Sequence, residues 1–373
     1  MLKEKKESGR FFSVIFASTL SLAFLLFLLR SDIAIDYMKI GLKLCSETVI
    51  PSLFPFMVIS SLMVSSGIGI KLCRPIALPA RLILGISESG ACAFLLGSLC
   101  GLPVGANTLC KMYDSGMISK TELERVLALC NNPGSAFVIS AVGISLFGNV
   151  QIGIILYVSI ILSSLTVGII SRLFHDKSSR EISVPKSIVN YEINKDFAGI
   201  FTAAVRDSAL SMLTVCAMIA FFSSFLGCVG ATLVRFGVSE TPIAFLFSFF
   251  EMSGGVSALS HLSLKANVVL CAAALGWSGM SVHFQVISLC AGRGISFKRY
   301  FISKILQSFI CAALAAVILR FFPMSEDAFI NSPFPLLEKK FLPNTLLFWS
   351  VISAAIAVSG MICFIKKSRN LKK

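Results

Sequence analysis

Two acidic residues stand alone within long apolar regions of this sequence. Glu88 is the single charged residue between Arg81 and Lys111, and Glu251 is similarly isolated in a later apolar region. A carboxylate at membrane depth must be neutral, paired or hydrated, so such residues usually have a function. We expect Glu88 and Glu251 to couple proton or cation movement to a solute, or to hold broken helices through hydrogen bonds.

Each acidic residue is followed by an apolar segment that glycine, proline or serine interrupts. Irregular backbone at membrane depth survives only where protein or a water-filled cavity satisfies its polar groups. The two segments, residues 100–107 and 276–285, therefore predict a solute site and are typical of a transporter. Helix breaks are predicted at Gly101, Pro103, Gly105, Gly276 and Gly279.

Polar side chains in or near these segments are candidates for solute contacts. Amides and hydroxyls can bind a carboxylate or a ring nitrogen, lysine attracts an anion, and a membrane histidine can carry charge or a proton. The alternatives are helix capping for Asn107, ordinary span-flanking charge for Lys111, and satisfaction of loose backbone for the Asn131-Asn132 pair. The predicted solute-binding residues are Asn107, Lys111, Asn131, Asn132, Ser278, Ser281, His283 and Gln285.

The composition indicates which class of protein must position these groups. Of the 373 residues 56% are hydrophobic and 14% charged, and the mean hydropathy is +0.86, which predicts an all-α polytopic membrane protein. We expect about 8–10 transmembrane helices with two broken or re-entrant segments. Uncharged runs long enough to approach or exceed a span include residues 11–29, 49–70, 137–170, 209–234 and 341–365, and the third can break at Gly148-Asn149.

The net charge is +14, and the lysines and arginines responsible lie mostly in loops and tails beside the apolar runs, where they indicate membrane topology. Lysine and arginine beside membrane spans are retained in the cytoplasm. This rule predicts cytoplasmic positions for residues 3–10, 172–206 and 366–373, and hence for both termini. A patch for anionic lipid or nucleic acid is the weaker alternative, so we expect a lipid bilayer as partner and no nucleic acid.

The order of landmarks divides the chain into two similar halves. We predict a tail and first span over 1–34, halves at 35–171 and 207–322 joined by a cytoplasmic linker at 172–206, and a loop, last span and basic tail over 323–373. An inverted repeat would set two broken helices face to face, with their amide ends toward an anion. Pairing the break at 101–105 with that at 276–279 creates a conflict, because strict inversion would place the basic loop around Arg293 outside.

Other classes of chemistry have little support in this sequence. The 12 cysteines are scattered without a C-x-x-C pair, so we expect reduced, buried thiols and no metal site. There is no P-loop, no H-E-x-x-H and no G-x-S-x-G motif. We therefore predict no enzyme activity and no cofactor, and any transport must be secondary or facilitated.

Four motifs of this sequence are characteristic: IPSLFPF at 50–56, LPVGA at 102–106, LCNNPGSAF at 129–137 and GMSVHFQ at 279–285. They resemble motifs of the sporulation integral membrane proteins that contain the nucleoside-recognition Gate domain. The resemblance covers roughly residues 35–319 and is strongest over 49–170, with Leu102 and Cys130 as departures from the family pattern. It implies export of dipicolinic acid from the mother cell across the outer forespore membrane, and it makes a homo-oligomer plausible.

Three functions stay open on this sequence. The first is a secondary-type carrier of a small anionic solute, namely dipicolinic acid. The second keeps the fold but carries a nucleoside or nucleobase, which would stack on aromatic rings and use amide pairs. The third is a non-transporting membrane scaffold for spore assembly, against which the lack of a sizeable soluble domain counts.

Overall fold

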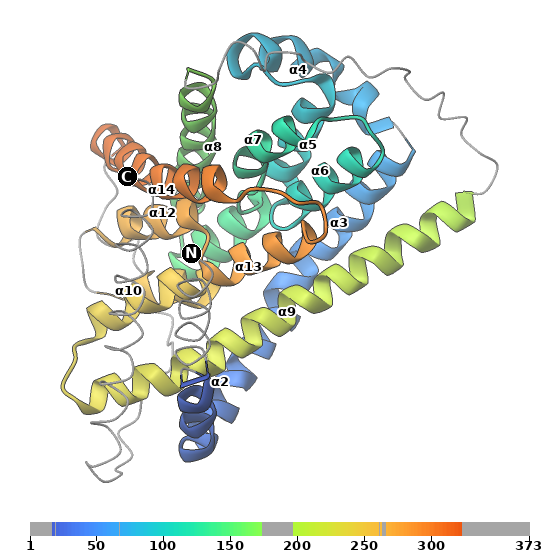
Figure 1. Cartoon of the computed structure of the whole chain (residues 1–373). Helices are drawn as coiled ribbons and strands as arrows, with labels where there is room; N and C mark the ends of the chain where they lie inside the picture. The colour runs from blue at the N-terminus through green and yellow to red at the C-terminus, as the bar shows by residue number, and fades with distance from the viewer. Residues whose placement is uncertain are drawn as a thin grey trace, which may run out of the picture. The chain divides into compact units, whose positions relative to one another are not determined.

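The fold is that of a computed structural model, which describes residues 17–18, 20–66, 68–173, 197–260, 262 and 266–322 (Figure 1). Every regular element within these ranges is a helix. The predicted span at 341–365, both basic tails and most of the linker lie outside the described residues, and the span at 11–29 is described only in part.

The all-α membrane architecture predicted from composition is confirmed. Five helices of the described chain are long and apolar enough to cross a bilayer, and a sixth span results if one bent helix pair is counted. The break expected at Gly148-Asn149 is also confirmed, because a short helix ends at Leu146 and the next begins at Val150. The five helices are Ser31–Ser65, Val150–Leu173, Ala198–Arg235, Asn267–Leu289 and Lys298–Phe321.

The chain divides into two compact units, and helices α2 (Ser31–Leu44) and α9 (Phe197–Arg235) belong to both. The described part of unit 1 comprises residues up to 39 and residues 223–239. Within it, the Ser224 hydroxyl donates to the Ala34 carbonyl at 2.7 Å. A Cβ atom on Gly227 would lie 2.7 Å from Tyr37 Cβ, so glycine allows the two helices to pack closely. The domain boundaries expected from the sequence stay predictions.

The described part of unit 2 lies within residues 40–222 and 240–322 and includes most of the two predicted halves. Its first half starts with a helical hairpin that turns at Gly101 to Pro103, where Gly101 has φ +84° and Pro103 offers no N–H. An interrupted helix pair follows, broken at residues 131–134, and then a long span. These elements are α5 (Glu88–Cys100), α6 (Val104–Asp114), α7 (Lys120–Cys130), η2 (Phe137–Leu146) and α8 (Val150–Leu173). They follow η1 (Cys45–Val49), α3 (Ile50–Ser65) and α4 (Ile68–Leu84).

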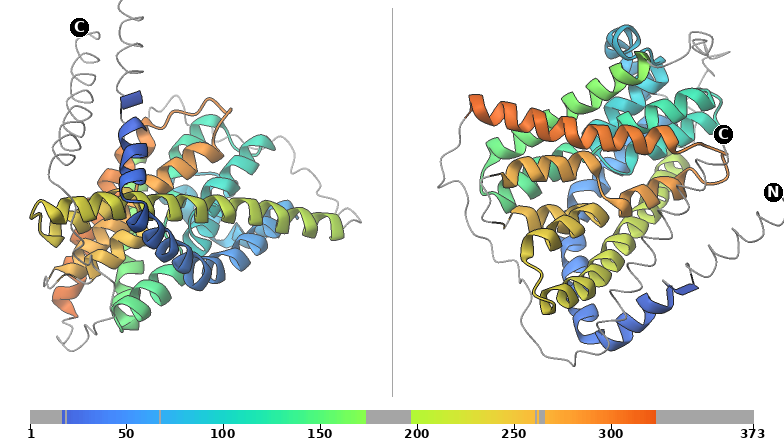
Figure 2. Two further views of the ribbon diagram at one scale, coloured as in Figure 1. Left: turned by 90° about the horizontal axis from the view of Figure 1, so that it is seen from below. Right: turned by 60° about the vertical axis from the view of Figure 1, so that its left-hand side comes forward.

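The second half repeats this order of elements, and its helices are the yellow to orange-red ribbons of Figure 2. A hairpin turns at Glu251, an interrupted pair breaks at Ser278 (φ +75°) and Gly279 (φ +81°), and a long span follows. The long spans of the two halves, α8 and α14, pack against each other. The elements are α10 (Glu240–Phe250), α11 (Met252–Ser260), α12 (Asn267–Trp277), α13 (Met280–Leu289) and α14 (Lys298–Phe321).

This order corrects the pairing of landmarks inferred from the sequence. The break at Gly101 corresponds to the turn at Glu251, and the break at 131–134 corresponds to the one at Ser278-Gly279. Two of the expected breaks are also wrong, because Gly105 lies inside α6 and Gly276 inside α12. Both are sites of close packing: a Cβ atom on Gly105 would lie 2.7 Å from the Cys130 carbonyl carbon, and one on Gly276 would lie 2.9 Å from Ser308 Cα.

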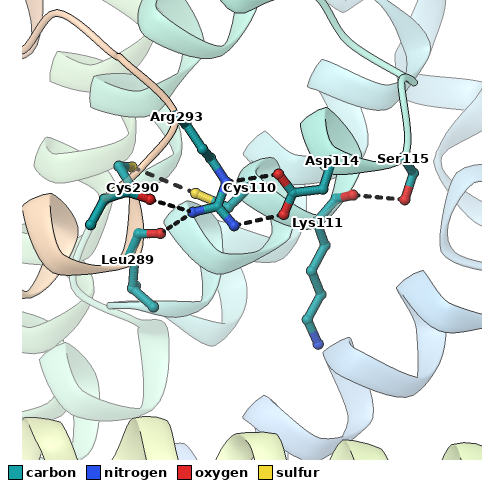
Figure 3. Close-up of polar contacts among 8 residues, drawn as sticks. Cys110, Lys111, Asp114, Ser115, Leu289, Cys290 and Arg293 are labelled. Carbon is teal, nitrogen blue, oxygen red and sulfur yellow. Dashed lines mark hydrogen bonds and ion pairs between the residues drawn. The ribbon is translucent and has the colours of Figure 1, made fainter.

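With the corrected pairing, the conflict over the basic loop disappears. The Arg293 guanidinium binds the Asp114 carboxylate through two hydrogen bonds, 2.8 and 2.6 Å long, so the ends of α6 and α13 share one end of unit 2 (Figure 3). The α5–α6 hairpin starts and finishes at that end, whereas α12–α13 runs toward it as a single span. The expected inverted repeat would require this arrangement, since α6 ends a hairpin and α13 ends an interrupted pair, and the inversion itself stays a prediction.

Candidate functional site

In each half the tip of the hairpin touches the break of the interrupted pair. A Cβ atom on Gly101 would lie 2.5 Å from the Gly134 nitrogen, so α5 and η2 meet at bare backbone. In the second half the Trp277 indole N–H donates to the Phe249 carbonyl at 2.9 Å. A Cβ atom on Gly279 would lie 2.8 Å from the Met252 nitrogen. Glycine is thus needed where tip and break come together.

A pocket lies where the tips and breaks of both halves converge. Its cavity volume is about 30 Å³, and one side of it is open. Leu102 and Glu251 come from the hairpin tips, Gly134 from the first break, and Ser281 and Gln285 from the helix after the second. The opposite wall is apolar and is formed by η1, α3 and α9.

Two helix amino ends face this pocket. The helix that contains η2 starts after Gly134, and its first internal bond runs from the Val138 N–H to the Gly134 carbonyl. Helix α13 starts after Gly279, with the first bond from the His283 N–H. The amides before these bonds have no partner within their helices, and they carry the positive end of the helix dipole. Such ends bind anions.

Ser281 and Gln285 add polar side chains to this part of the pocket. Ser281 is 1% exposed and its hydroxyl is buried with no hydrogen-bond partner in the described chain. Gln285 is 3% exposed and lies one turn further along α13, on the same side. An unsatisfied buried hydroxyl costs about 1–3 kcal/mol, which a bound solute with a suitable acceptor would recover.

Glu251 caps the amino end of α11. Its carboxylate accepts hydrogen bonds from the backbone N–H groups of Ser253, at 2.9 Å, and Gly254, at 2.5 Å. These bonds use the amides that would otherwise be free at this helix start, so the carboxylate holds the hairpin turn. Glu88 occupies a different position, in the first turn of α5, where Ser87 caps the helix through a 3.1 Å bond from the Gly90 N–H.

A buried polar network lies behind the pocket wall. The Asn131 amide donates to the Tyr300 hydroxyl at 3.0 Å, and His283 Nδ1 lies 2.8 Å from the same oxygen. The Asn132 side-chain oxygen accepts from Lys304 at 3.3 Å and from Gln307 at 2.8 Å. Helix α14 therefore connects the break of the first half to the helix that follows the break of the second.

The remaining predicted residues lie apart from the pocket lining. The Ser278 hydroxyl bonds back to the Leu275 carbonyl at 3.2 Å, and Asn107 is half-buried in the first turn of α6. The Lys111 ammonium donates to Ser61 at 3.0 Å and lies 3.6 Å from the Asp207 carboxylate. Figure 3 shows it pointing away from the Asp114–Arg293 pair.

Three residues of the buried network were missed in the sequence. Tyr300, Lys304 and Gln307 are four and three positions apart, so they share one face of α14. The sequence signal was a polar i, i+4, i+7 pattern within an otherwise apolar helix. The pattern is inconspicuous because the exposed Lys298 and Arg299 directly precede it.

The loops after α6 and α13 are joined by more than one contact (Figure 3). The Cys110 and Cys290 sulfur atoms lie 3.5 Å apart, beside the Asp114–Arg293 ion pair. Hydrogen bonds from Arg293 lower the pKa of the Asp114 carboxyl below its ordinary value. All the cysteines within the described ranges are free and buried.

Comparison with known proteins gives one informative similarity. The chain is 28% identical over 314 residues to the sporulation integral membrane protein YlbJ of Bacillus subtilis (strain 168). The aligned region covers 75% of this chain and 76% of that protein. No family model and no solved structure matches the chain.

Proposed function

The similarity supports a YlbJ-like sporulation membrane family, and from this premise we propose that the chain is a secondary-type carrier of a small anionic solute. Dipicolinic acid is the proposed cargo, exported from the mother cell across the outer forespore membrane. A membrane role in sporulation follows from the relative, whereas the carrier activity and the cargo are our proposals.

The observation that carries the proposal is the pocket between the two hairpin tips and the two helix breaks. Two helix amino ends face it, and the unpartnered Ser281 hydroxyl adds a further donor. A ring with two carboxylates would place one carboxylate near each amino end, while its flat faces contact Leu102, Phe137 and the apolar wall. The inverted halves suit alternating access around such a central site.

The proposal gives Glu251 a supporting role. Its carboxylate is held by the amides of α11, so it would shape the pocket without binding an anion directly. In this proposal Ser281 and Gln285 contact the solute, whereas Asn131, Asn132 and His283 support the backbone that does so. Asn107 and Lys111 are not assigned solute contacts.

We propose that the end of unit 2 that contains Arg125, Arg172 and Arg293 faces the cytoplasm. The Arg125 side chain donates to the Gly85 carbonyl, and Arg172 donates to the Ile83 carbonyl at 3.1 Å, which gathers basic residues at one end. Basic residues beside spans are retained inside. The cytoplasmic termini expected from the sequence stay predictions.

A nucleoside carrier is the second candidate. The Gln285 amide and the Phe137 ring in the pocket are groups that bind and stack on a nucleobase. The two helix amino ends at the pocket favour the anion, because a neutral nucleoside would not be attracted by the positive ends of their dipoles. A non-transporting scaffold for spore assembly would not need a pocket of this kind.

The test is flux of labelled dipicolinate into proteoliposomes that contain the purified protein, with uridine as competitor. We expect Ser281→Ala to weaken apparent affinity by roughly tenfold to a hundredfold, because a hydrogen bond to a charged group contributes about 1.5–3 kcal/mol. Ser159→Ala is the matched control: this serine is also fully buried, but its hydroxyl bonds to its own helix at 2.7 Å.

The outcomes separate the three functions. Dipicolinate flux that is weakened by Ser281→Ala and unaffected by Ser159→Ala supports the proposed cargo and site. Uridine flux without dipicolinate flux would replace the cargo with a nucleoside. If folded protein moves neither solute, the carrier proposal fails and the scaffold gains support.

A further inference from the structure

Lys304 is a buried lysine that the proposed solute pocket does not use. It lies in α14, has no solvent exposure, and donates to Gln307 Oε1 at 2.9 Å and Asn132 Oδ1 at 3.3 Å. Both partners are neutral amide oxygens, and no carboxylate of the described chain lies within ion-pair distance of it. A buried charge without a counter-charge is costly, so an ionisable residue of this kind inside a membrane indicates a function.

The hydrogen bonds around Lys304 suit two protonation states. A neutral amine has two N–H donors, and the two amide oxygens use both of them. An ammonium has a third N–H, which donates to none of the described residues in this arrangement of side chains. Protonation therefore adds both a unit charge and an unsatisfied donor, so the network must rearrange when Lys304 takes up a proton.

Spare acceptors are present in the same network. The Asn131 side-chain oxygen and His283 Nε2 are buried without hydrogen-bond partners in the described chain. The other ionisable groups whose charges act on Lys304 or respond to it are Cys130 on α7, Cys311 on α14 and His283 on α13. None of these is an acid that would hold the ammonium permanently charged.

Lys304 is linked to both walls of the pocket. Its partner Asn132 directly precedes Pro133 and Gly134, which line the pocket at the first break. Tyr300 lies one helical turn before Lys304 and contacts Asn131 and His283. His283 is two residues after Ser281, so one face of α14 touches the supports of both helix amino ends.

We propose that Lys304 takes up a proton when the anionic solute binds and returns it when the solute leaves, so that proton and anion move together. The step is proton transfer alone: the amine lone pair accepts a proton from the aqueous phase, and the side chain gains one positive charge. That charge lies behind the two amino ends and attracts the bound anion, and by reciprocity the anion favours protonation. The inference rests on the proposed carrier function.

The experiment compares the pH dependence of dipicolinate affinity and flux in wild type, Lys304→Gln and Lys304→Met. Lys298→Gln is the matched control, because Lys298 is an exposed lysine at the start of the same helix. In wild type we expect affinity to rise as pH falls through the titration of Lys304, by up to about tenfold per pH unit for one linked proton. Both Lys304 variants should lose this dependence, and Lys298→Gln should keep it.

A second readout does not require transport. The thermal unfolding midpoint of the purified protein, followed over the same pH range, should vary with pH in wild type and less so in Lys304→Gln. Flux that persists in the Lys304 variants with an unchanged pH profile overturns the inference but leaves the carrier function intact. If dipicolinate neither binds nor moves, the proposed carrier function fails. Independently of transport, a pH dependence of the unfolding midpoint that is identical in wild type and Lys304→Gln shows that Lys304 does not titrate, which overturns the inference.

If the Lys304 variants do not fold, the proposal is tested on wild-type protein alone. A pH gradient imposed across wild-type proteoliposomes should accelerate dipicolinate entry from the acidic side. Entry that is indifferent to the gradient overturns the proposal.

Discussion

Replacement of Gly105 by alanine is expected to separate α6 from α7 and to destabilise the protein. A Cβ atom there would lie 2.7 Å from the Cys130 carbonyl carbon and closer still to its oxygen, whereas ordinary contacts begin at 3.4 Å. The helices must therefore retreat by at least about 0.7 Å. The nearest atoms belong to backbone, so no side-chain rotation relieves the contact.

The expected change in stability of Gly105→Ala is the difference between an overpacking cost and a gain in helix propensity. Overpacking a close contact costs about 1–3 kcal/mol, and more where only backbone can move. Alanine recovers up to about 1 kcal/mol through its better helix propensity. We expect a net loss of about 2 kcal/mol, which for a chain of 373 residues corresponds to a fall of roughly 2–4 °C in the unfolding temperature.

Gly97 makes the test more specific, because it presses on the same carbonyl from α5. A Cβ atom on Gly97 would lie 2.9 Å from the Cys130 carbonyl carbon and 2.9 Å from Gly105 Cα. Once one alanine has displaced α7, the second alanine should destabilise the protein less. The loss of stability in the double variant should therefore be clearly smaller than the sum of the losses in the two single variants. Gly116→Ala is the control, because its added Cβ meets nothing within 4 Å. Its loss of stability should simply add to the loss caused by Gly97→Ala or Gly105→Ala.

The assay is thermal unfolding in detergent at one fixed scan rate, because membrane proteins often unfold irreversibly. Strict additivity of the Gly97→Ala and Gly105→Ala losses would refute the shared contact. A Gly105→Ala protein as stable as wild type would refute the close packing itself.

Two further predictions concern the loops in Figure 3. Because the Arg293 guanidinium lowers the pKa of Asp114 below 3.8, the ion pair stabilises the fold above that pH and the stabilisation is lost as pH falls toward the lowered pKa. Asp114→Asn should therefore cost at most about 1 kcal/mol at neutral pH, since both side chains are partly exposed, and almost nothing in strong acid. An equal loss at both pH values, measured by thermal unfolding, would contradict this. Oxidation with copper–phenanthroline should join Cys110 to Cys290, whose sulfur atoms are 3.5 Å apart, so that the halves stay linked on a non-reducing gel after trypsin cuts the basic linker. Persistence of the link in Cys110→Ser would mean that another cysteine pair forms it.

Much of the fold was predictable from local sequence. The break at Gly101 to Pro103 follows from residues that lack either a Cβ or an N–H, and the break at Ser278-Gly279 from a serine-glycine pair at positive φ. Gly105 and Gly276 were interpreted as breaks because the same residue type also allows close packing. Only the neighbouring backbone, the Cys130 carbonyl for Gly105 and Ser308 for Gly276, distinguishes the two uses.

The site was predictable only in part. Ser281 and Gln285 line the pocket, and their predicted contact with a solute stays a prediction, whereas Lys111 pairs with Asp207, which is distant in the sequence. The inverted repeat was expected, but with the wrong elements paired, because motifs reveal breaks without revealing which helix turns back. The hairpin at Glu251 became recognisable from the packing of α10 against α11.

The sequence by itself determined the membrane class, the positions of most helix breaks and the residue types available for a solute site. These depend on hydropathy, on glycine and proline geometry, and on charge, which are properties of local sequence. The tertiary structure alone decided that tips and breaks from both halves enclose one pocket, and that Lys304 lies behind it. Those facts depend on contacts between residues more than a hundred positions apart, such as Asn132 with Lys304, which no local pattern contains.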